Sequence, residues 1–231
     1  MRCGLLEAEF DPAEGWLRRI RVQGREVIRA IYGAVRDRHW GTVAGRIHGL
    51  RIAQEPDQFR IVFKMEYVAR DIHFRWRADI AGDKTSRITF RFAGEGISGF
   101  WKNRIGLCVL HPLENCAGER CRVETCDGSV RDATFPELIA PHQPFKNVRS
   151  LTTEAASNQR VEVRFEGDVF ETEDQRNWTD ASFKTYSTPL ERPFPAWIAP
   201  ASRVEQSVIV ELTSAPASSS AAHSPATDVE L

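Results

Sequence analysis

The sequence predicts an all-β protein, a large antiparallel β-sandwich with little helix. Apolar and polar residues alternate over 72–80 and again over 87–92, with Gly82 and Asp83 between the two runs. Such alternation is typical of a hairpin with one buried face. Similar short runs recur along the chain between residues that favour turns, so we expect about a dozen strands. The predicted core-facing residues of the first run are Ile72, Phe74, Trp76, Ala78 and Ile80.

The run 25–32 could form a helix by propensity alone. Its β-branched residues and the flanking Gly24 and Gly33 favour a strand instead. The continuous apolar run 105–110 predicts a strand buried on both faces, which ends at His111 because Pro112 cannot continue an interior strand. Other expected strands are 17–22, 46–52, 58–67, 121–126, 129–134, 148–153, 160–165, 179–185 and 203–212, and expected loops are 97–103, 135–145 and 191–200.

These strands fit one domain over residues 1–212. From Thr213 the chain is rich in Ser, Ala and Pro and has almost no large apolar side chains. Such a segment cannot offset its ordering entropy, which predicts a disordered tail over 213–231.

Composition excludes several classes of function. Lys and Arg total 31 against 32 Asp and Glu, a formal net charge of -1, which gives no reason to expect nucleic acid or an anionic membrane as a partner. The N-terminus shows no long apolar run, so we expect a cytoplasmic protein without a signal peptide or membrane span.

No metal or cofactor is expected. Cys116, Cys121 and Cys126 are evenly spaced, whereas zinc sites usually hold closer cysteine pairs. Free thiols are therefore the default. Phosphate-binding loops, nucleophile elbows and HExxH motifs do not occur in the sequence.

The richest segment chemically is 171–186, which mixes acids, bases, amides and aromatic residues. Hydroxyl groups need donors and acceptors, and a ring can cover the apolar face of a sugar. The segment therefore suits a small polyhydroxylated ligand, although a solvated loop with ion pairs is an alternative. Its candidate residues are Glu173, Asp174 and Asp180 as catalytic acids or bases, and Arg176, Asn177, Trp178, Lys184 and Tyr186 for substrate binding.

In a strand over 179–185, Asp180 and Lys184 would share one face while Phe183 points into the core. Either Glu173 or Asp174 could then act as a general base, and Arg176 could hold a carboxylate or a lactone carbonyl.

Two further segments carry candidates. His111 lies at a strand end and titrates near neutral pH, so it is a catalytic candidate; a simple structural role is the alternative. The segment 36–41 again combines charges, a histidine and a ring before a glycine, although a turn packed on Trp40 explains it equally well. Its candidate substrate-binding residues are Arg36, Asp37, His39 and Trp40.

The motifs 24–29, 36–42, 104–112 and 173–186 together resemble the N-terminal region of the D-apionate lactonase family, over residues of about 5 to 212. The last two motifs are long and distinctive. The resemblance implies a β-sandwich similar to the supersandwich of galactose mutarotases. It also implies hydrolysis of a sugar-derived lactone to an aldonate in apiose catabolism.

Members of that family are longer and continue into a (β/α)-barrel, so the resemblance implies a barrel domain or subunit as a partner. If the barrel carries the catalytic carboxylates, this chain alone is inactive. Three functions therefore stay open: a lactone hydrolase, a non-catalytic module that binds carbohydrate or docks onto a barrel, and a mutarotase-like epimerase. The ligand in each case is a sugar or a sugar lactone.

Overall fold

The computed structural model describes residues 1–156 and 158–214. Within them, seventeen strands belong to one continuous sheet and the helical parts are two 3-10 turns, so the predicted all-β class is confirmed. The elements are β1 (Arg2–Cys3), β2 (Leu6–Asp11), β3 (Trp16–Val22), β4 (Arg25–Asp37), β5 (Gly45–Glu55), β6 (Gln58–Ala69), β7 (Ile72–Asp83), β8 (Arg87–Gly96), β9 (Phe100–Pro112), η1 (Leu113–Asn115), β10 (Arg120–Thr125), β11 (Val130–Thr134), β12 (Phe145–Ala156), β13 (Gln159–Glu166), β14 (Phe170–Asp174), η2 (Gln175–Trp178), β15 (Ser182–Tyr186), β16 (Ala196–Ile198) and β17 (Arg203–Ser214).

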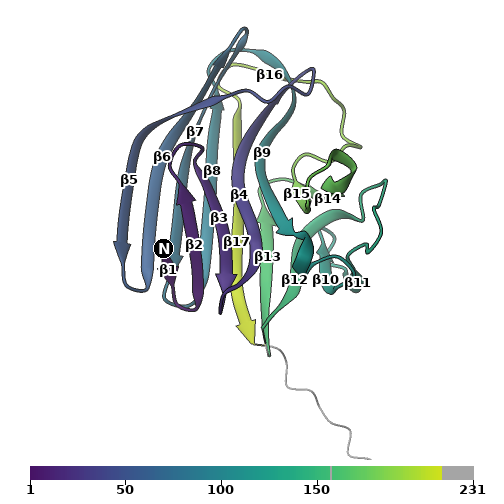
Figure 1. Cartoon of the computed structure of the whole chain (residues 1–231). Helices are drawn as coiled ribbons and strands as arrows, with labels where there is room; N and C mark the ends of the chain where they lie inside the picture. Colours follow the sequence, from purple (N-terminus) through teal and green to yellow (C-terminus); the bar gives the residue numbers. More distant parts are fainter. Residues whose placement is uncertain (157, 215–231) are drawn as a thin grey trace, which may run out of the picture.

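The sheet is antiparallel and curls on itself, as Figure 1 shows. In the first part of the sheet, hydrogen-bonded neighbours follow the order β5, β6, β7, β8, β17, β13 and β12. Strand β12 also pairs with β14, and from there the order of neighbouring strands is β15, β9, β4, β3, β2 and β1. A side hairpin, β10 and β11, extends from β12.

The core lies between the two arms of this curled sheet and forms one cluster of buried residues. Phe10 of β2 contacts Phe63 of β6 with ring centroids 5.8 Å apart. Gly33 of β4 faces the ring of Trp76, where a Cβ atom would come within 2.6 Å of that ring. The absence of a side chain at Gly33 thus lets the two arms approach closely.

The hairpin expected from alternation is confirmed. Strands β7 and β8 pair in register, and the five residues predicted to face the core are all buried. The run 25–32 is a strand, because its apolar side chains pack on both sides of β4.

Four expectations about element bounds were wrong. Residues 100–103 are not a loop but begin β9, because they pair with β4 and β16. The turn expected at Gly82 and Asp83 lies after them, since β7 continues to Asp83. A short strand, β16, interrupts the expected loop 191–200. Strand β15 begins at Ser182 rather than at residue 179, because η2 precedes it and Thr179 has a left-handed φ of 64°.

The predicted tail over 213–231 needs one correction. Thr213 and Ser214 belong to β17, whose backbone pairs with β13 up to that point. Residues 215–231 lie outside the described residues. Among the helical turns that the structure describes, neither is long or apolar enough to cross a membrane.

Candidate functional site

Strand β9 organises the candidate site because it lies between β4 and β15. The register places Arg36 opposite Arg104, and both Tyr32 and Tyr186 opposite Cys108. Side chains on a strand alternate between faces, so these residues project to one side of the sheet. Their neighbours along β4 and β9, such as Ile31, Val35 and Val109, project to the other side and are buried in the core.

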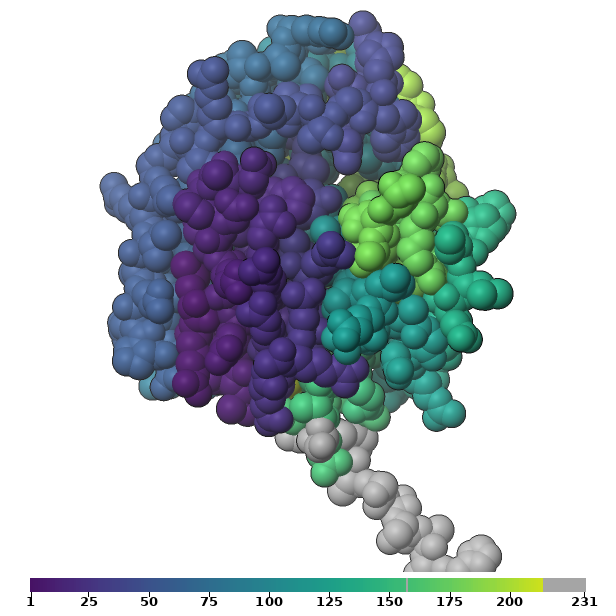
Figure 2. Space-filling view, viewed as in Figure 1, coloured from purple at the N-terminus to yellow at the C-terminus, as the bar shows by residue number. Residues whose placement is uncertain are grey.

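A cavity of about 610 Å³ lies over this polar face; we call it the β9 cavity. The loop after β15 helps to enclose it, and Figure 2 shows this yellow-green segment beside the N-terminal strands. The cavity combines charged groups, a phenol and exposed indoles, which is the mixture that a polar ring-shaped ligand requires. Its lining residues are Tyr32, Ala34, Arg36, Trp40, Arg104, Gly106, Cys108, Glu173, Gln175, Trp178, Lys184, Tyr186, Ser187 and Leu190.

An acid and a base meet at one wall of the β9 cavity. Glu173 of β14 lies opposite Lys184 of β15, and the Lys184 Nζ is 2.5 Å from Glu173 Oε1. The Gln175 amide donates a second hydrogen bond of 2.6 Å to the same oxygen. Both charged side chains are less than one-fifth exposed, so this pair is better shielded from solvent than a surface ion pair.

Tyr186 adds a buried phenol behind this pair. Its hydroxyl donates to Glu171 Oε1 over 2.6 Å, and the Leu190 N–H donates to the same oxygen over 2.7 Å. Burial, with the nearby charge of Glu173 and the hydrogen bond to Glu171, raises the pKa of Tyr186 well above its usual range. The phenol is therefore protonated at neutral pH and can act as a hydrogen-bond donor but not as a base.

Arg104 lies deeper, and only 6% of its surface is exposed. Its guanidinium carbon is 5.2 Å from the ring centroid of Trp40 and 5.1 Å from that of Phe194. The two terminal nitrogens donate to the carbonyls of Asn103 and Pro189, whereas the buried Nε has no partner. Burial lowers the pKa of Arg104, although an arginine remains charged under ordinary conditions.

Three predicted residues of segment 171–186 hold a loop rather than line the cavity. Asp174 accepts hydrogen bonds from Arg176 and from the Ala140 N–H. Arg176 in turn donates to three carbonyls between residues 136 and 138, and Asn177 donates to Ala140. Burial acts to raise the pKa of Asp174, but the hydrogen bonds from Arg176 and Ala140 outweigh it and hold this pKa below its usual value.

His111 points to the core side of β9, away from the cavity. Its Nε2 is 2.8 Å from Thr185 Oγ1, and its ring centroid is 5.9 Å from that of Phe135. Burial lowers the pKa of His111 to about 4. Because residues 109 and 111 share one face of the strand, the same alternation that puts Cys108 in the cavity turns His111 inward.

The remaining candidates lie at the edge of the site or beside it. Asp180 is 42% exposed and is 3.5 Å from Arg29. Asp37 accepts backbone hydrogen bonds of 2.8 Å from His39 and from Gly41, which shapes the turn that carries Trp40. Asp37 and His39 line a separate, smaller cavity of about 160 Å³.

The β9 cavity therefore joins six of the predicted site residues: Arg36, Trp40, Glu173, Trp178, Lys184 and Tyr186. Sequence reasoning missed the contribution of the central strand, above all Arg104. The available signal was the charged residue directly before the apolar run 105–110, because a strand that is buried on both faces usually carries only apolar side chains.

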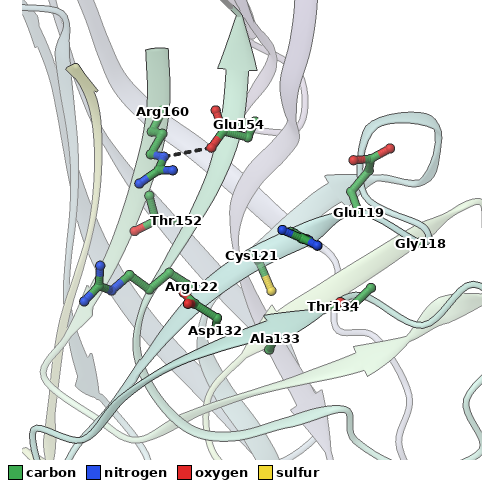
Figure 3. A pocket seen from close by; sticks show the side chains of 11 residues that line it. Gly118, Glu119, Cys121, Arg122, Asp132, Ala133, Thr134, Thr152, Glu154 and Arg160 are labelled. Carbon is green, nitrogen blue, oxygen red and sulfur yellow. Dashed lines mark hydrogen bonds and ion pairs between the residues drawn. The ribbon is translucent and has the colours of Figure 1, made fainter. Parts of the chain in front are cut away.

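A second cavity, of about 650 Å³, opens beside the β10–β11 hairpin and is drawn in Figure 3. It contains none of the predicted site residues. Arg160 on its wall is bound to Glu154 over 2.8 Å. Its charges balance, with three basic and three acidic side chains, so the β9 cavity is the better candidate. The charged lining residues are Glu119, Arg120, Arg122, Asp132, Glu154 and Arg160.

Comparison with known proteins assigns the family. The model of the D-apionate lactonase N-terminal domain matches residues 1–215. This chain belongs to that family. It is 38% identical over 215 residues to the D-apionate lactonase of Brucella anthropi. The match covers 92% of this chain but 35% of that relative, so the chain spans about a third of its length.

Solved structures with the same fold include a putative aldose epimerase and a galactose mutarotase-like protein. A putative aldose 1-epimerase from Escherichia coli K12 superposes with a TM-score of 0.58 at 9% identity, over 93% of this chain and 98% of that one. A galactose mutarotase-like protein from Lactobacillus casei gives 0.58 at 8% identity, over 92% and 99%. This chain therefore has a galactose mutarotase-like fold, and the identities are too low to transfer residue roles.

Proposed function

We propose that the β9 cavity binds a sugar-derived lactone and that this chain takes part in hydrolysing it to the aldonate. The observation that carries the proposal is the Glu173–Lys184 pair at a cavity wall, with Tyr186 behind it and Trp40 and Trp178 at the rim. Membership of the lactonase family and the mutarotase-like fold support a carbohydrate ligand.

The arrangement can carry out ester hydrolysis by general-base chemistry. Glu173 is the candidate base that accepts a proton from the attacking water. Lys184 then stabilises the oxyanion that develops on the lactone carbonyl. As this intermediate collapses, the ring acyl–oxygen bond breaks and Glu173 returns its proton to the leaving ring oxygen, while an exposed indole covers the apolar face of the ring. Of the four catalytic residues predicted from the sequence, Glu173 is the one that lines the cavity, so it is preferred as the base over Asp174 and Asp180, and the proposal gives His111 no catalytic role.

Glu173→Gln tests this chemistry. General-base catalysis contributes about a hundredfold or more, so we expect the variant to lower kcat by at least that factor on the lactone of D-apionate. The purified chain and the variant are compared by continuous titration of the released acid. Glu7→Gln, an exposed change on β2, is the matched control and should keep the activity of the parent chain. Equal activity of Glu173→Gln and its parent would refute the assignment.

A second function, carbohydrate binding without turnover, is favoured by one specific observation. Both Lys184 and Gln175 already bond to the same oxygen of Glu173, so this oxygen is less free to accept a proton from water. In this case the purified chain binds the lactone or the aldonate in calorimetric titrations but releases no acid. Sugar binding with no turnover on a panel of aldonolactones would select this function.

The biological context is part of the proposal. The relative that extends beyond this chain is named a D-apionate lactonase, which supports a role in apiose catabolism. A barrel domain or subunit as the partner is a further part of the proposal. A mutarotase-like reaction is the third alternative. It predicts interconversion of aldose anomers by the purified chain, which polarimetry measures directly.

A further inference from the structure

We infer that Ser187 is a specificity-determining hydrogen-bond donor in the β9 cavity, and that Gln206 orients its hydroxyl group. The Ser187 hydroxyl donates to an acceptor oxygen of the ligand, such as a sugar hydroxyl or a ring oxygen. This inference rests on the proposed sugar-binding role of the cavity. It adds one residue that touches the ligand and one that positions it.

Gln206 is a polar side chain held in the protein interior. It lies on β17 and is only 5% exposed. Its Oε1 accepts a hydrogen bond of 2.8 Å from the Leu107 N–H of β9. A backbone N–H can only donate, so this bond fixes which end of the Gln206 amide is the oxygen. The amide nitrogen therefore lies at the other end, towards Ser187.

The direction of the hydrogen bond to Ser187 follows from this orientation. The Gln206 Nε2 donates to Ser187 Oγ over 2.7 Å. An amide nitrogen donates and does not accept, so the Ser187 oxygen is the acceptor and its own proton points elsewhere. Within residues 1–156 and 158–214, the structure shows no protein acceptor for that proton. Because Ser187 lines the β9 cavity, a bound ligand is the partner to which it can donate.

Gly106 of β9 makes room for this arrangement. Its φ is 151°, and a Cβ atom there would come within 2.4 Å of Gln206 Oε1 and 2.5 Å of Ser187 Oγ. Any other residue at this position would displace both polar groups. Gly106 itself lines the cavity, so the space that it leaves brings the Ser187 hydroxyl to the ligand-binding side of β9.

Ser187 and Lys184 contact different parts of the cavity. Lys184 lies opposite Leu110, and Ser187 follows three residues later, where Gln206 joins it to Leu107. Three residues of a strand span roughly 10 Å. A ligand whose carbonyl meets Lys184 therefore presents the oxygens of its far end to Ser187. A donor at that end discriminates against analogues that lack an oxygen there, because the donor is then left without a partner.

Ser187→Ala tests the donor. Calorimetric titration of the full chain with D-apionate measures binding, and hydrolysis does not consume this probe. We expect about a tenfold loss of affinity, as for the removal of one shielded hydrogen bond. Ser182→Ala is the matched control, because Ser182 is a buried serine of β15 that is not among the lining residues, and it should bind like the parent. Circular dichroism checks that both variants are folded.

Gln206→Glu tests the positioning role. A protonated carboxyl group donates to Ser187 as the amide does, whereas an ionised carboxylate can only accept and turns the Ser187 proton away from the ligand. The affinity of this variant relative to the parent should therefore be near the parent value at acidic pH. It should fall to the level of Ser187→Ala as the new carboxyl group ionises. A merely structural role of Gln206 gives a ratio that does not change with pH.

The outcomes distinguish the two proposals. If the parent binds D-apionate and folded Ser187→Ala binds it equally well, the donor assignment is overturned and the sugar-binding role stands. If Ser187→Ala loses affinity but the ratio for Gln206→Glu is independent of pH, the positioning role of Gln206 is overturned. If the parent binds neither D-apionate nor any aldonolactone, the proposed function of the cavity fails and the inference fails with it.

Discussion

Single residues of this protein acquire their roles from the face of the strand on which they lie. Glu173 and Asp174 are adjacent in the sequence, yet Glu173 pairs with Lys184 in the cavity while Asp174 binds Arg176 beside the ring of Phe183. The carboxylate of one is therefore available to a ligand, and the carboxylate of the other fixes the loop 136–140. Neighbouring acids in a strand should not be treated as interchangeable candidates.

His111 provides a prediction about pH at this scale. Its pKa falls to about 4 on burial, against about 6.5 in an unfolded chain, so between these values the unfolded state binds more protons. Stability from the neutral ring is complete above the unfolded pKa and is lost as the pH falls from about 6.5 through about 4. Urea unfolding at a series of pH values should show this slope, and His111→Leu should reduce it.

The expected NMR result is a His111 ring that stays neutral at pH 5.5. His39, which is exposed, is the internal comparison in the same spectra. An unfolding free energy with the same pH dependence in parent and His111→Leu would contradict the assignment, since the other titrating groups are common to both proteins.

At the scale of elements, β15 connects the core to the site. Phe183 points inward, 4.9 Å from the ring centroid of Phe135, while Lys184 and Tyr186 point into the cavity. The preceding 3-10 turn is capped by Asp174, whose side chain accepts from the Arg176 N–H. Anchoring on one face thus orients the polar groups on the other.

Phe183→Ala tests this coupling. Truncating a fully buried phenylalanine typically costs about 3–5 kcal/mol, so we expect a loss of that order in the free energy of unfolding from urea titration. The displaced β15 should also weaken binding of the aldonate. In contrast, Lys184→Gln should weaken binding with little change in stability, and an equal stability loss in both variants would argue against separate faces.

At the scale of the whole molecule, one curled sheet and one core hold both sides of the cavity. Strands β4 and β9 come from the N-terminal half, and β14 and β15 come from the C-terminal half. In the sheet, however, β4 pairs with β9, β9 pairs with β15, and β15 pairs with β14. The cavity therefore cannot form before the C-terminal strands have paired with β9.

This continuity predicts that residues 1–214 unfold as one cooperative unit, in agreement with the single domain expected from the sequence. Urea transitions followed by circular dichroism and by tryptophan fluorescence should coincide. Two separated transitions would show that the β10–β15 region folds independently of the N-terminal arm.

The sequence by itself determined the fold class, the main hairpins and the family. Period-two alternation reports which side of a strand is buried, and the long motifs 104–112 and 173–186 are specific enough to assign the family. It also located six of the lining residues, because acids, bases and rings are concentrated in two short segments.

Only the tertiary structure decided which of these residues meet. The pairing of β9 with both β4 and β15 brings Arg104 to Arg36 and to the wall that carries Lys184, and no local pattern encodes which strands become neighbours. The start of β15 at Ser182 likewise depends on the preceding turn, and it leaves Asp180 before the strand, where it pairs with Arg29 and does not line the cavity. The physical reason is that register and strand order are set by long-range packing, whereas alternation is local.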